Sequence, residues 1–244
     1  MFEKPYKESR TIRKYECDFH GNLKADVLLN LMEECFENQM RLEGFSNDKL
    51  RTMGQALLVN EMDFEIKDSC EKGDVLEFET FPYETVRAIF PRAARVYKGD
   101  KLIATSLSQW TVVDLDKRKI LRESPVTDGF YKEEYSGKLP KFIRVKNSVD
   151  YEKVGEYQVA YTNLDKNGHM NNVEHLSLAL NYIPELLQGY KIKKIKMHFV
   201  KEVLNGEKLS IFEGKEKGIE GMTYYFYLDN SKSINSIIEI EIIQ

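Results

Sequence analysis

The sequence has little of what marks a disulfide-bonded, zinc-binding or fibrous protein. Its 244 residues include only 3 cysteines, and no two of them form a CxxC pair. We therefore expect neither a disulfide framework nor a zinc site, and we expect the thiols to be reduced. The chain has 14 glycines and 6 prolines. This is fewer than average for a chain of this length, and it excludes collagen-like and linker-rich architectures.

Long apolar runs and a surplus of basic residues are also missing. No stretch approaches the roughly 18 apolar residues of a membrane span, and the first residues have no signal-peptide core. Lys and Arg number 36 against 40 Asp and Glu, a net charge of −4, whereas a nucleic-acid-binding protein usually has a basic surplus. We therefore expect a cytoplasmic globular protein with no nucleic-acid or membrane partner.

The first half of the chain shows one long helix pattern followed by a series of strand patterns. Residues 25–44 carry apolar side chains at helical spacing, and Gly44 is a plausible stop. A short helix is predicted at 46–53. Strand patterns follow at 55–67, 73–86, 88–98 and 102–114. The polar stretch 115–150 is interpreted as a connection with some local helix.

The same order of elements recurs in the second half. A strand pattern at 154–164 precedes a predicted helix at 172–183. Four further strands are predicted at 190–202, 207–215, 221–229 and 234–243. Residues 18–23 also align with residues 165–170, with aspartate and glycine at matching places. Together these patterns indicate an internal duplication.

A helix followed by antiparallel strands buries its apolar stripe best when the sheet curls around it. We therefore predict an α+β fold, a double hot-dog with two tandem repeats, each a long helix wrapped by a curved antiparallel sheet. The first repeat, with the connecting segment, is expected to span residues 1–147 and the second residues 148–244. If the two repeats are aligned so that Phe64 matches Phe199, Lys67 of the first repeat matches Glu202 of the second.

The densest polar cluster lies directly before the second helix. Residues 163–172 contain four asparagines, one aspartate and one histidine. A turn at Asn167 and a helix cap at Asn171 or Asn172 would explain part of the cluster. They do not require Asp165 and His169, which are therefore candidate functional residues.

The same stretch partly matches a calcium-binding EF-hand loop. Asn163, Asp165, Asn167, Gly168 and Glu174 fall at ligand or turn positions of that motif. The first position should be aspartate, however, and the preceding residues alternate like a strand instead of forming a helix. We interpret the match as coincidental and expect no bound metal.

Three segments together resemble the acyl-acyl-carrier-protein (acyl-ACP) thioesterases of plants and bacteria. Asp165, Asn167 and His169 at alternate positions, followed by paired asparagines, resemble the active-site segment of that family. Residues 199–203 resemble its aromatic-basic-glutamate segment, which ends in Glu202 and Val203, and residues 104–114 resemble a strand of the N-terminal hot dog. Plant members have cysteine where this chain has Val203, and no cysteine follows residue 70.

The resemblance implies hydrolysis of fatty acyl-ACP without a cofactor. Glu202 would act as general base toward water, and Asn167 would donate its amide to the carbonyl or the water. His169 would polarise the carbonyl or orient the water, while Asp165 would orient Asn167 or His169. Backbone N–H groups of residues 169–171 would receive the oxyanion at the helix N-terminus. If the segment is extended, the three side chains at alternate positions share one side.

The first repeat lacks these groups, so one active site per chain is expected. Its helix stripe and the start of the following strand are candidates for lining an acyl tunnel: Leu28, Leu31, Met32, Cys35 and residues 54–58. The partner would be acyl carrier protein, and the chain would be a monomer or homodimer. Two lysine-rich runs, near residues 191–201 and 138–146, could dock the acidic carrier or could be solvated surface.

Two other function classes remain open at this point. A hot-dog protein could sense acyl thioesters without catalysis, although no effector domain stands apart from the repeats. A hot-dog dehydratase acting on 3-hydroxyacyl thioesters would also use a histidine and an acidic residue.

Overall fold

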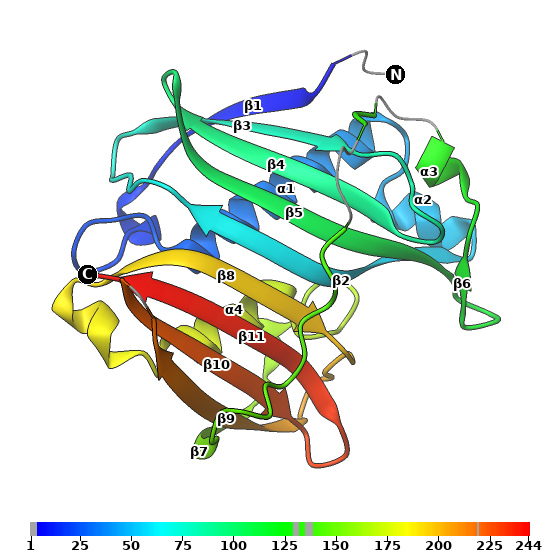
Figure 1. The fold of residues 1–244 in the computed structure, drawn as a ribbon. Helices are drawn as coiled ribbons and strands as arrows, with labels where there is room; N and C mark the ends of the chain where they lie inside the picture. Colours follow the sequence, from blue (N-terminus) through cyan, green and yellow to red (C-terminus); the bar gives the residue numbers. More distant parts are fainter. Residues whose placement is uncertain (1–3, 129–131, 135–138, 219) are drawn as a thin grey trace. The chain divides into compact units, whose positions relative to one another are not determined.

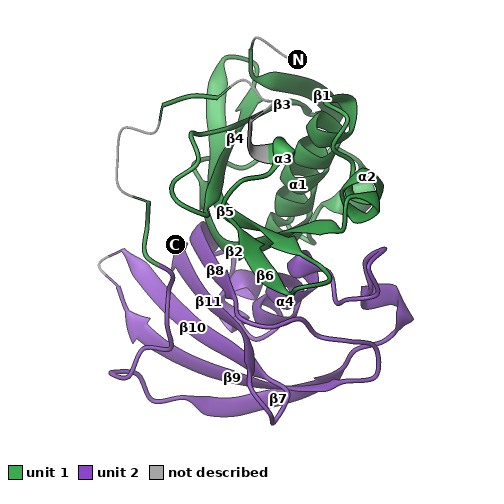
Figure 2. Cartoon of the chain, turned by 90° about the vertical axis from the view of Figure 1, so that its right-hand side faces the viewer, with its two compact units in different colours: residues 1–141 green, residues 142–244 purple. Residues whose placement is uncertain are grey.

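The computed structural model describes residues 4–128, 132–134, 139–218 and 220–244. The chain divides into two compact units, Met1–Lys141 and Phe142–Gln244 (Figures 1 and 2). The sequence predicted a boundary at 147/148, and contacts within the structure place it at 141/142. Each unit consists of one curved antiparallel sheet and the helix packed against it.

The first unit contains the long helix and a five-stranded sheet with one short added strand. The sheet order is β1-β3-β4-β5-β2, and β6 pairs with β5. Its strands are β1 (Tyr6–Thr11), β2 (Gln55–Ile66), β3 (Val75–Pro82), β4 (Phe90–Lys98), β5 (Lys101–Asp114) and β6 (Lys119–Leu121). Its helices are η1 (Lys14–Glu16), α1 (Ala25–Leu42), α2 (Asn47–Thr52) and α3 (Pro125–Asp128). The predicted long helix and the four strands after it are confirmed, while β6 was not predicted.

Helix α1 forms because its apolar side chains recur at helical spacing and face the sheet. Leu28, Met32 and Cys35 are almost fully buried, and each buried aliphatic side chain contributes about 2 kcal/mol. The helix ends where Gly44 adopts a φ of +84°, a left-handed conformation that glycine adopts without steric cost. The predicted stop at Gly44 is therefore confirmed.

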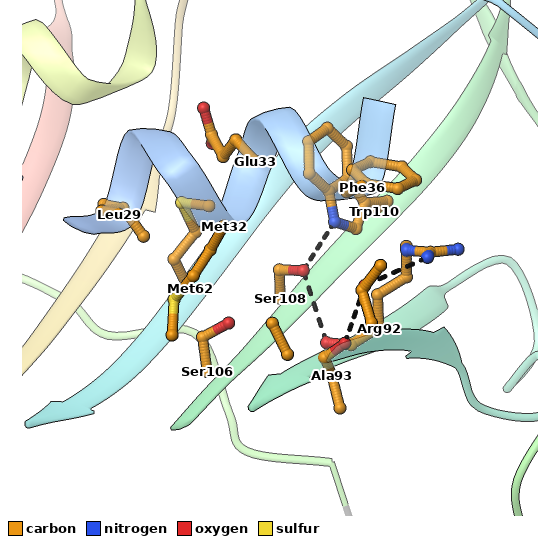
Figure 3. Close-up of a pocket in the computed structure, with 12 residues that line it drawn as sticks. Leu29, Met32, Glu33, Phe36, Met62, Arg92, Ala93, Ser106, Ser108 and Trp110 are labelled. Atoms are coloured by element: carbon orange, nitrogen blue, oxygen red, sulfur yellow. Dashed lines mark hydrogen bonds between the residues drawn. The ribbon is translucent and has the colours of Figure 1, made fainter. Parts of the chain in front are cut away.

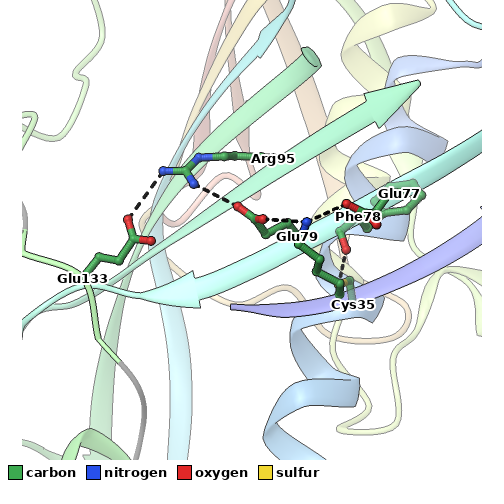
Figure 4. Close-up of polar contacts among 7 residues, drawn as sticks. Cys35, Glu77, Phe78, Glu79, Arg95 and Glu133 are labelled. Carbon is green, nitrogen blue, oxygen red and sulfur yellow. Dashed lines mark hydrogen bonds and ion pairs between the residues drawn. The ribbon is translucent and has the colours of Figure 1, made fainter. Parts of the chain in front are cut away.

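The outer face of the first sheet carries a ladder of ion pairs that ties three strands together (Figure 4). Lys7 Nζ of β1 lies 2.7 Å from Glu77 and 3.2 Å from Glu79 of β3. Arg95 of β4 contacts Glu79 at 2.9 Å and Glu133 at 3.5 Å. Cross-strand pairs of this kind contribute roughly 0.2–1 kcal/mol each and fix the strand register.

The second unit repeats the plan with a shorter helix. Its sheet order is β8-β11-β10-β9-β7. Its strands are β7 (Glu152–Gln158), β8 (Lys191–Phe199), β9 (Lys208–Lys217), β10 (Gly221–Asp229) and β11 (Ile234–Ile243). Its helices are η2 (Tyr161–Asn163), α4 (Asn172–Leu180) and η3 (Pro184–Gln188).

The predicted helix at 172–183 is too long. Helix α4 ends at Leu180, and the 3-10 helix η3 begins at Pro184. Proline has no N–H to donate and disfavours a helical conformation at the residue before it, here Ile183. The second helix therefore has 9 residues, whereas α1 has 18.

Matching backbone hydrogen bonds show that the two units are repeats of one structure. In the turn before α1, Asp18 N–H donates to the Asn22 carbonyl at 2.7 Å, and Asp18 Oδ1 accepts from Asn22 N–H at 2.9 Å. In the turn before α4, Asp165 and His169 make the same two bonds, at 2.8 and 3.1 Å. These turns are 147 positions apart, as the sequence alignment predicted.

A second set of matching bonds lies at a different offset. Leu23 N–H donates to the Cys70 carbonyl at 2.7 Å, and Met170 N–H donates to the Val203 carbonyl at 2.8 Å. The offset between Cys70 and Val203 is 133, so the second unit has 14 fewer residues between its turn and the loop that follows β8 than the first unit has between its turn and the loop that follows β2. The shorter helix α4 accounts for most of this difference.

Candidate active site

The residues from Asp165 to His169 form a tight turn and not an extended segment. Gly168 N–H donates to the Asp165 carbonyl at 3.0 Å, and Gly168 has a φ of +80°, which favours glycine. Asp165 Oδ1 accepts from the N–H groups of Asn167 at 2.8 Å and His169 at 3.1 Å. The condition of an extended segment is therefore not met, because the side chain of Asp165 closes a turn.

Asp165 also holds the side chain of Asn167. Its second oxygen, Oδ2, accepts from Asn167 Nδ2 at 2.8 Å. Asp165 is half-buried, whereas Asn167 is exposed. One carboxylate therefore orients both the backbone and the amide of Asn167, and that amide lies at the surface where a substrate can approach.

His169 and Glu202 are brought together from two separate loops. The Nε2 atom of His169 lies 2.7 Å from Oε2 of Glu202. The two side chains are 34% and 55% exposed, respectively. A β-bridge between His169 and Leu204, together with the bond from Met170 N–H to the Val203 carbonyl, joins the loops. All four predicted site residues therefore lie in one surface cluster of the second unit.

Most backbone N–H groups before α4 are already hydrogen-bonded. Residues 169–171 were expected to receive an oxyanion, but each donates within the unit. Their acceptors are Asp165 Oδ1, the Val203 carbonyl and the Asn163 carbonyl. Asn171 is the helix cap, since its Oδ1 accepts from Val173 N–H at 2.9 Å. Among the described residues nothing accepts from the N–H of Asn172, the first residue of α4.

Glu202 has no acidic counterpart in the first unit. Lys67 N–H donates to the carbonyl of Ile103 at 2.8 Å, and Val200 N–H donates to the carbonyl of Asn235 at 2.9 Å. Ile103 and Asn235 are each the extra residue of a β-bulge in the neighbouring strand. Lys67 is therefore equivalent to Val200, at the same offset of 133. Ser69, and not Lys67, occupies the position of Glu202, because the sequence alignment used an offset of 135.

The residues that resemble an EF-hand are bonded to one another. Asn163 is buried; its Oδ1 accepts from Ala160 N–H at 3.0 Å, and its Nδ2 donates to Glu174 at 2.8 Å. The first and last positions of the motif therefore satisfy each other. Strand β7 lies before the loop, but it ends at Gln158 and the 3-10 helix η2 follows it, so the strand predicted at 154–164 is too long at its end. In the described part of the chain, no group of three or more His, Cys, Asp or Glu is placed to hold a metal.

The first unit contains a small pocket between α1 and the strands β2, β4 and β5 (Figure 3). Its cavity of about 20 Å³ has room for a water molecule and not for an acyl chain. Of the residues expected to line an acyl tunnel, Met32 lines this pocket, whereas Leu28, Leu31, Cys35 and residues 54–58 do not. Filling this pocket with an acyl chain would require side chains to move.

A buried guanidinium lies at one end of this pocket. Arg92 is 2% exposed, donates to Gln39 and to Thr80 Oγ1 at 3.2 Å, and stacks over Phe36 at 4.0 Å. Burial lowers the pKa of Arg92 to about 9, so the side chain remains charged at neutral pH. Within the described residues no carboxylate pairs with Arg92. The pocket thus has a charged end, opposite the apolar end at Leu29 (Figure 3).

Several lysines of the two basic runs are paired with acidic neighbours. Lys193 lies 3.2 Å from Glu220, Lys196 lies 2.9 Å from Glu239, and Lys146 lies 2.5 Å from Glu216. Lys138 lies outside the described residues. These pairs reduce the local surplus of positive charge that a carrier-docking surface would use.

Across the described ranges, no helix combines the length and the apolar character that a membrane crossing requires.

Comparisons with known proteins find relatives for both units. The acyl-ACP thioesterase N-terminal domain matches residues 3–133, and the acyl-ACP thioesterase C-terminal domain matches residues 146–242. The oleoyl-acyl carrier protein thioesterase 2 of Arabidopsis thaliana, a chloroplastic protein, is 25% identical over 219 residues. That alignment covers 81% of this chain and 59% of the plant protein, so the chain spans less than two thirds of that relative.

Two solved structures share the fold over nearly the whole chain. An acyl-ACP thioesterase from Bacteroides thetaiotaomicron has a TM-score of 0.84 at 22% identity, covering 99% of this chain and 100% of its own. The 12:0-ACP thioesterase of Umbellularia californica has a TM-score of 0.83 at 15% identity, with coverages of 98% and 93%. The predicted α+β double hot-dog fold is confirmed.

Proposed function

Because this chain belongs to the acyl-ACP thioesterase family, we propose that it hydrolyses the thioester of fatty acyl-ACP. The products are a free fatty acid and the carrier with its phosphopantetheine thiol. The observation that carries the proposal is the 2.7 Å contact between His169 and Glu202, next to the turn that holds Asp165 and Asn167. Hydrolysis of this bond needs an activated water and donors for the developing oxyanion, and no cofactor.

Glu202 is the proposed general base. Its carboxylate is 55% exposed, so water can reach it, while His169 holds one oxygen at 2.7 Å. The other oxygen takes a proton from water as the water oxygen bonds to the carbonyl carbon. The tetrahedral intermediate then collapses, the C–S bond breaks, and the sulfur leaves with the bonding electrons. The proton on Glu202 passes to the thiolate or to solvent, which restores the base.

Asn167 and the start of α4 are the proposed oxyanion donors. Asp165 fixes the amide of Asn167 through the 2.8 Å bond from Nδ2 to Oδ2, so the amide is oriented before substrate binds. The N–H of Asn172 lies at the N-terminus of a helix, where the helix dipole favours negative charge. These two donors replace the N–H groups of residues 169–171 in the mechanism.

The two units have separate proposed roles. Residues 148–244 carry the chemistry, and residues 1–147 bind the acyl chain. Such binding requires the pocket beside Met32 to enlarge, because its cavity is about 20 Å³. The partner is acyl carrier protein, and we propose a cytoplasmic location.

One assay separates hydrolysis from the two other activities that a hot-dog fold supports. The protein is incubated with acyl-ACP and with 3-hydroxyacyl-ACP, and thiol release, loss of water and complex formation are followed. Hydrolysis releases free thiol from both substrates. Loss of water without thiol would identify a dehydratase, and binding with neither product would identify a sensor; either result would contradict the proposal.

A further inference from the structure

One buried side chain of the second unit reaches the loop that carries Glu202. Asn235 is 0% exposed, and its Nδ2 donates to the Glu202 carbonyl at 3.3 Å. The backbone carbonyl of Asn235 accepts from the N–H groups of Val200 at 2.9 Å and Lys201 at 3.1 Å. Three consecutive residues of the loop are therefore bonded to a single residue of β11.

Asn235 lies in a β-bulge, which orients its side chain toward this loop. In the pairing of β10 with β11, Leu228 lies opposite Ser236 and Asp229 lies opposite Ile234. Asn235 is therefore an extra residue without a partner across the ladder. Bulges of this kind redirect a side chain and occur often beside active sites.

The first unit has the same bulge with an apolar residue in it. The pairing of β4 with β5 skips Ile103, whose carbonyl accepts from Lys67 N–H at 2.8 Å and Asp68 N–H at 3.3 Å. Ile103 is also 0% exposed. The backbone arrangement is thus shared, and the units differ in the side chain that the bulge presents.

Two buried positions near Asn235 are also polar in the second unit and apolar in the first. His175 and Ser236 are buried in the second unit, and His175 Nδ1 lies 2.9 Å from Ser236 Oγ. Their counterparts in the first unit are Leu28 and Ala104, which are buried and apolar. His175 and Ser236 contact each other, and Asn235 is the polar substitution whose side chain contacts the Glu202 loop.

Stability alone does not explain an asparagine at this position. Among the described residues Asn235 Oδ1 has no hydrogen-bond partner, and an unpaired buried amide oxygen is destabilising. An isoleucine fills the equivalent bulge of the first unit without that cost. The destabilising asparagine occurs in the unit that carries Glu202. The first unit, which has isoleucine in the bulge, has Ser69 at the position of Glu202.

We infer that Asn235 is a positioning residue, which holds the backbone of Glu202 so that its carboxylate stays against His169. The inference rests on the proposed function, since it assigns Asn235 a role through the proposed base. Asn235 contacts the carbonyl of Glu202 and not its carboxylate. Its substitution should therefore act on the chemical step and leave substrate binding unchanged.

The first test exchanges the bulge residue for that of the other repeat. Asn235→Ile should lower kcat for acyl-ACP about 10- to 100-fold, the range for a misplaced catalytic group, with KM and melting temperature little changed. In a Glu202→Gln background the same substitution should cause no further loss, because the two residues act as one unit. If Asn235→Ile does not fold, Asn235→Ala removes the same hydrogen bond without added bulk. A full additional loss in the double variant would overturn the inference.

A control variant and a second readout separate positioning from general damage. Ser236→Ala breaks the neighbouring buried polar pair without touching the loop and should leave kcat within about twofold of the parent. Amide hydrogen exchange at residues 202–204 should be faster in Asn235→Ile than in the parent and in Ser236→Ala. A parent that does not hydrolyse acyl-ACP would contradict the proposed function alone, and unchanged exchange in Asn235→Ile would contradict the inference alone.

Discussion

Ser69 of the first unit and Glu202 of the second occupy the same position in the two repeats. Ser69 precedes Cys70, whose carbonyl accepts from Leu23 N–H at 2.7 Å. Glu202 precedes Val203, whose carbonyl accepts from Met170 N–H at 2.8 Å. A serine hydroxyl is not a general base at neutral pH, whereas a carboxylate is. The two repeats therefore have equivalent loops, of which only the second has a carboxylate at this position.

The repeats should respond differently to equivalent substitutions. His169→Ala should lower turnover of acyl-ACP about 10²-fold or more, the effect of losing a group that acts at the reacting carbonyl or water. Asn22→Ala and Ser69→Ala alter the matching positions of the first unit and should leave turnover within a few-fold of the parent. Steady-state rates for the three variants decide the matter. Equal losses from Asn22→Ala and His169→Ala would mean that the active site is composite.

Thiol chemistry should make no contribution. Burial raises the pKa of Cys70 to about 12 and raises that of Cys35 as well, so neither forms a nucleophilic thiolate near neutral pH. A variant with Cys17→Ser, Cys35→Ala and Cys70→Val should retain most of its hydrolytic rate, since Val203 already occupies the position equivalent to Cys70. Loss of the chemical step with an unchanged melting temperature would contradict a water-based mechanism.

Stability should depend on pH through His175. Burial lowers the pKa of His175 to about 4 from an ordinary 6.5, because its surroundings, Ser236 and Phe199, are uncharged. The unfolded chain takes up a proton near pH 6.5 and the folded chain only near pH 4. Acidification across this window should therefore cost about 3 kcal/mol of unfolding free energy.

The matched variant for this effect is His175→Leu, which introduces the residue that the first unit has at position 28. Denaturant unfolding at pH 7 and pH 4.5 should show a smaller loss of stability on acidification in the variant than in the parent. Identical pH dependence in both proteins would show that His175 does not titrate as its burial implies.

Metal ions should be irrelevant to both activity and stability. Asn163 and Glu174, the end positions of the EF-hand match, are hydrogen-bonded to each other at 2.8 Å. Chelators should leave the rate and the melting temperature unchanged. A rise in melting temperature with added calcium would show that the loop opens to bind the ion.

Most of the fold could be predicted from the sequence because apolar periodicity and turn residues mark the long elements. The short elements β6 and η3 were missed, since three to five residues carry too little periodicity. The end of α4 was placed too late, because the apolar pattern continues to Ile183 while Pro184 stops the helix. The conformational restriction imposed by Pro184 therefore outweighs the helical spacing of the apolar residues.

The four candidate site residues could be selected from the sequence, but their geometry could not. Asp165 closes a turn through its own side chain, and no spacing rule distinguishes that from an extended segment. Asn235 was missed because a bulge residue looks like any other in a strand. Its signal becomes visible only when the repeats are aligned through their hydrogen bonds, which pair it with Ile103.

The most direct test of the central claim is the single-turnover rate of Glu202→Gln with acyl-ACP. Glutamine keeps the shape of glutamate and can still accept a hydrogen bond from His169, but it cannot take a proton from water. The rate of thioester cleavage should fall about 10²- to 10⁴-fold, with the affinity for acyl-ACP and the melting temperature unchanged. A rate equal to that of the parent would show that Glu202 is not the base and would contradict the mechanism proposed for this site.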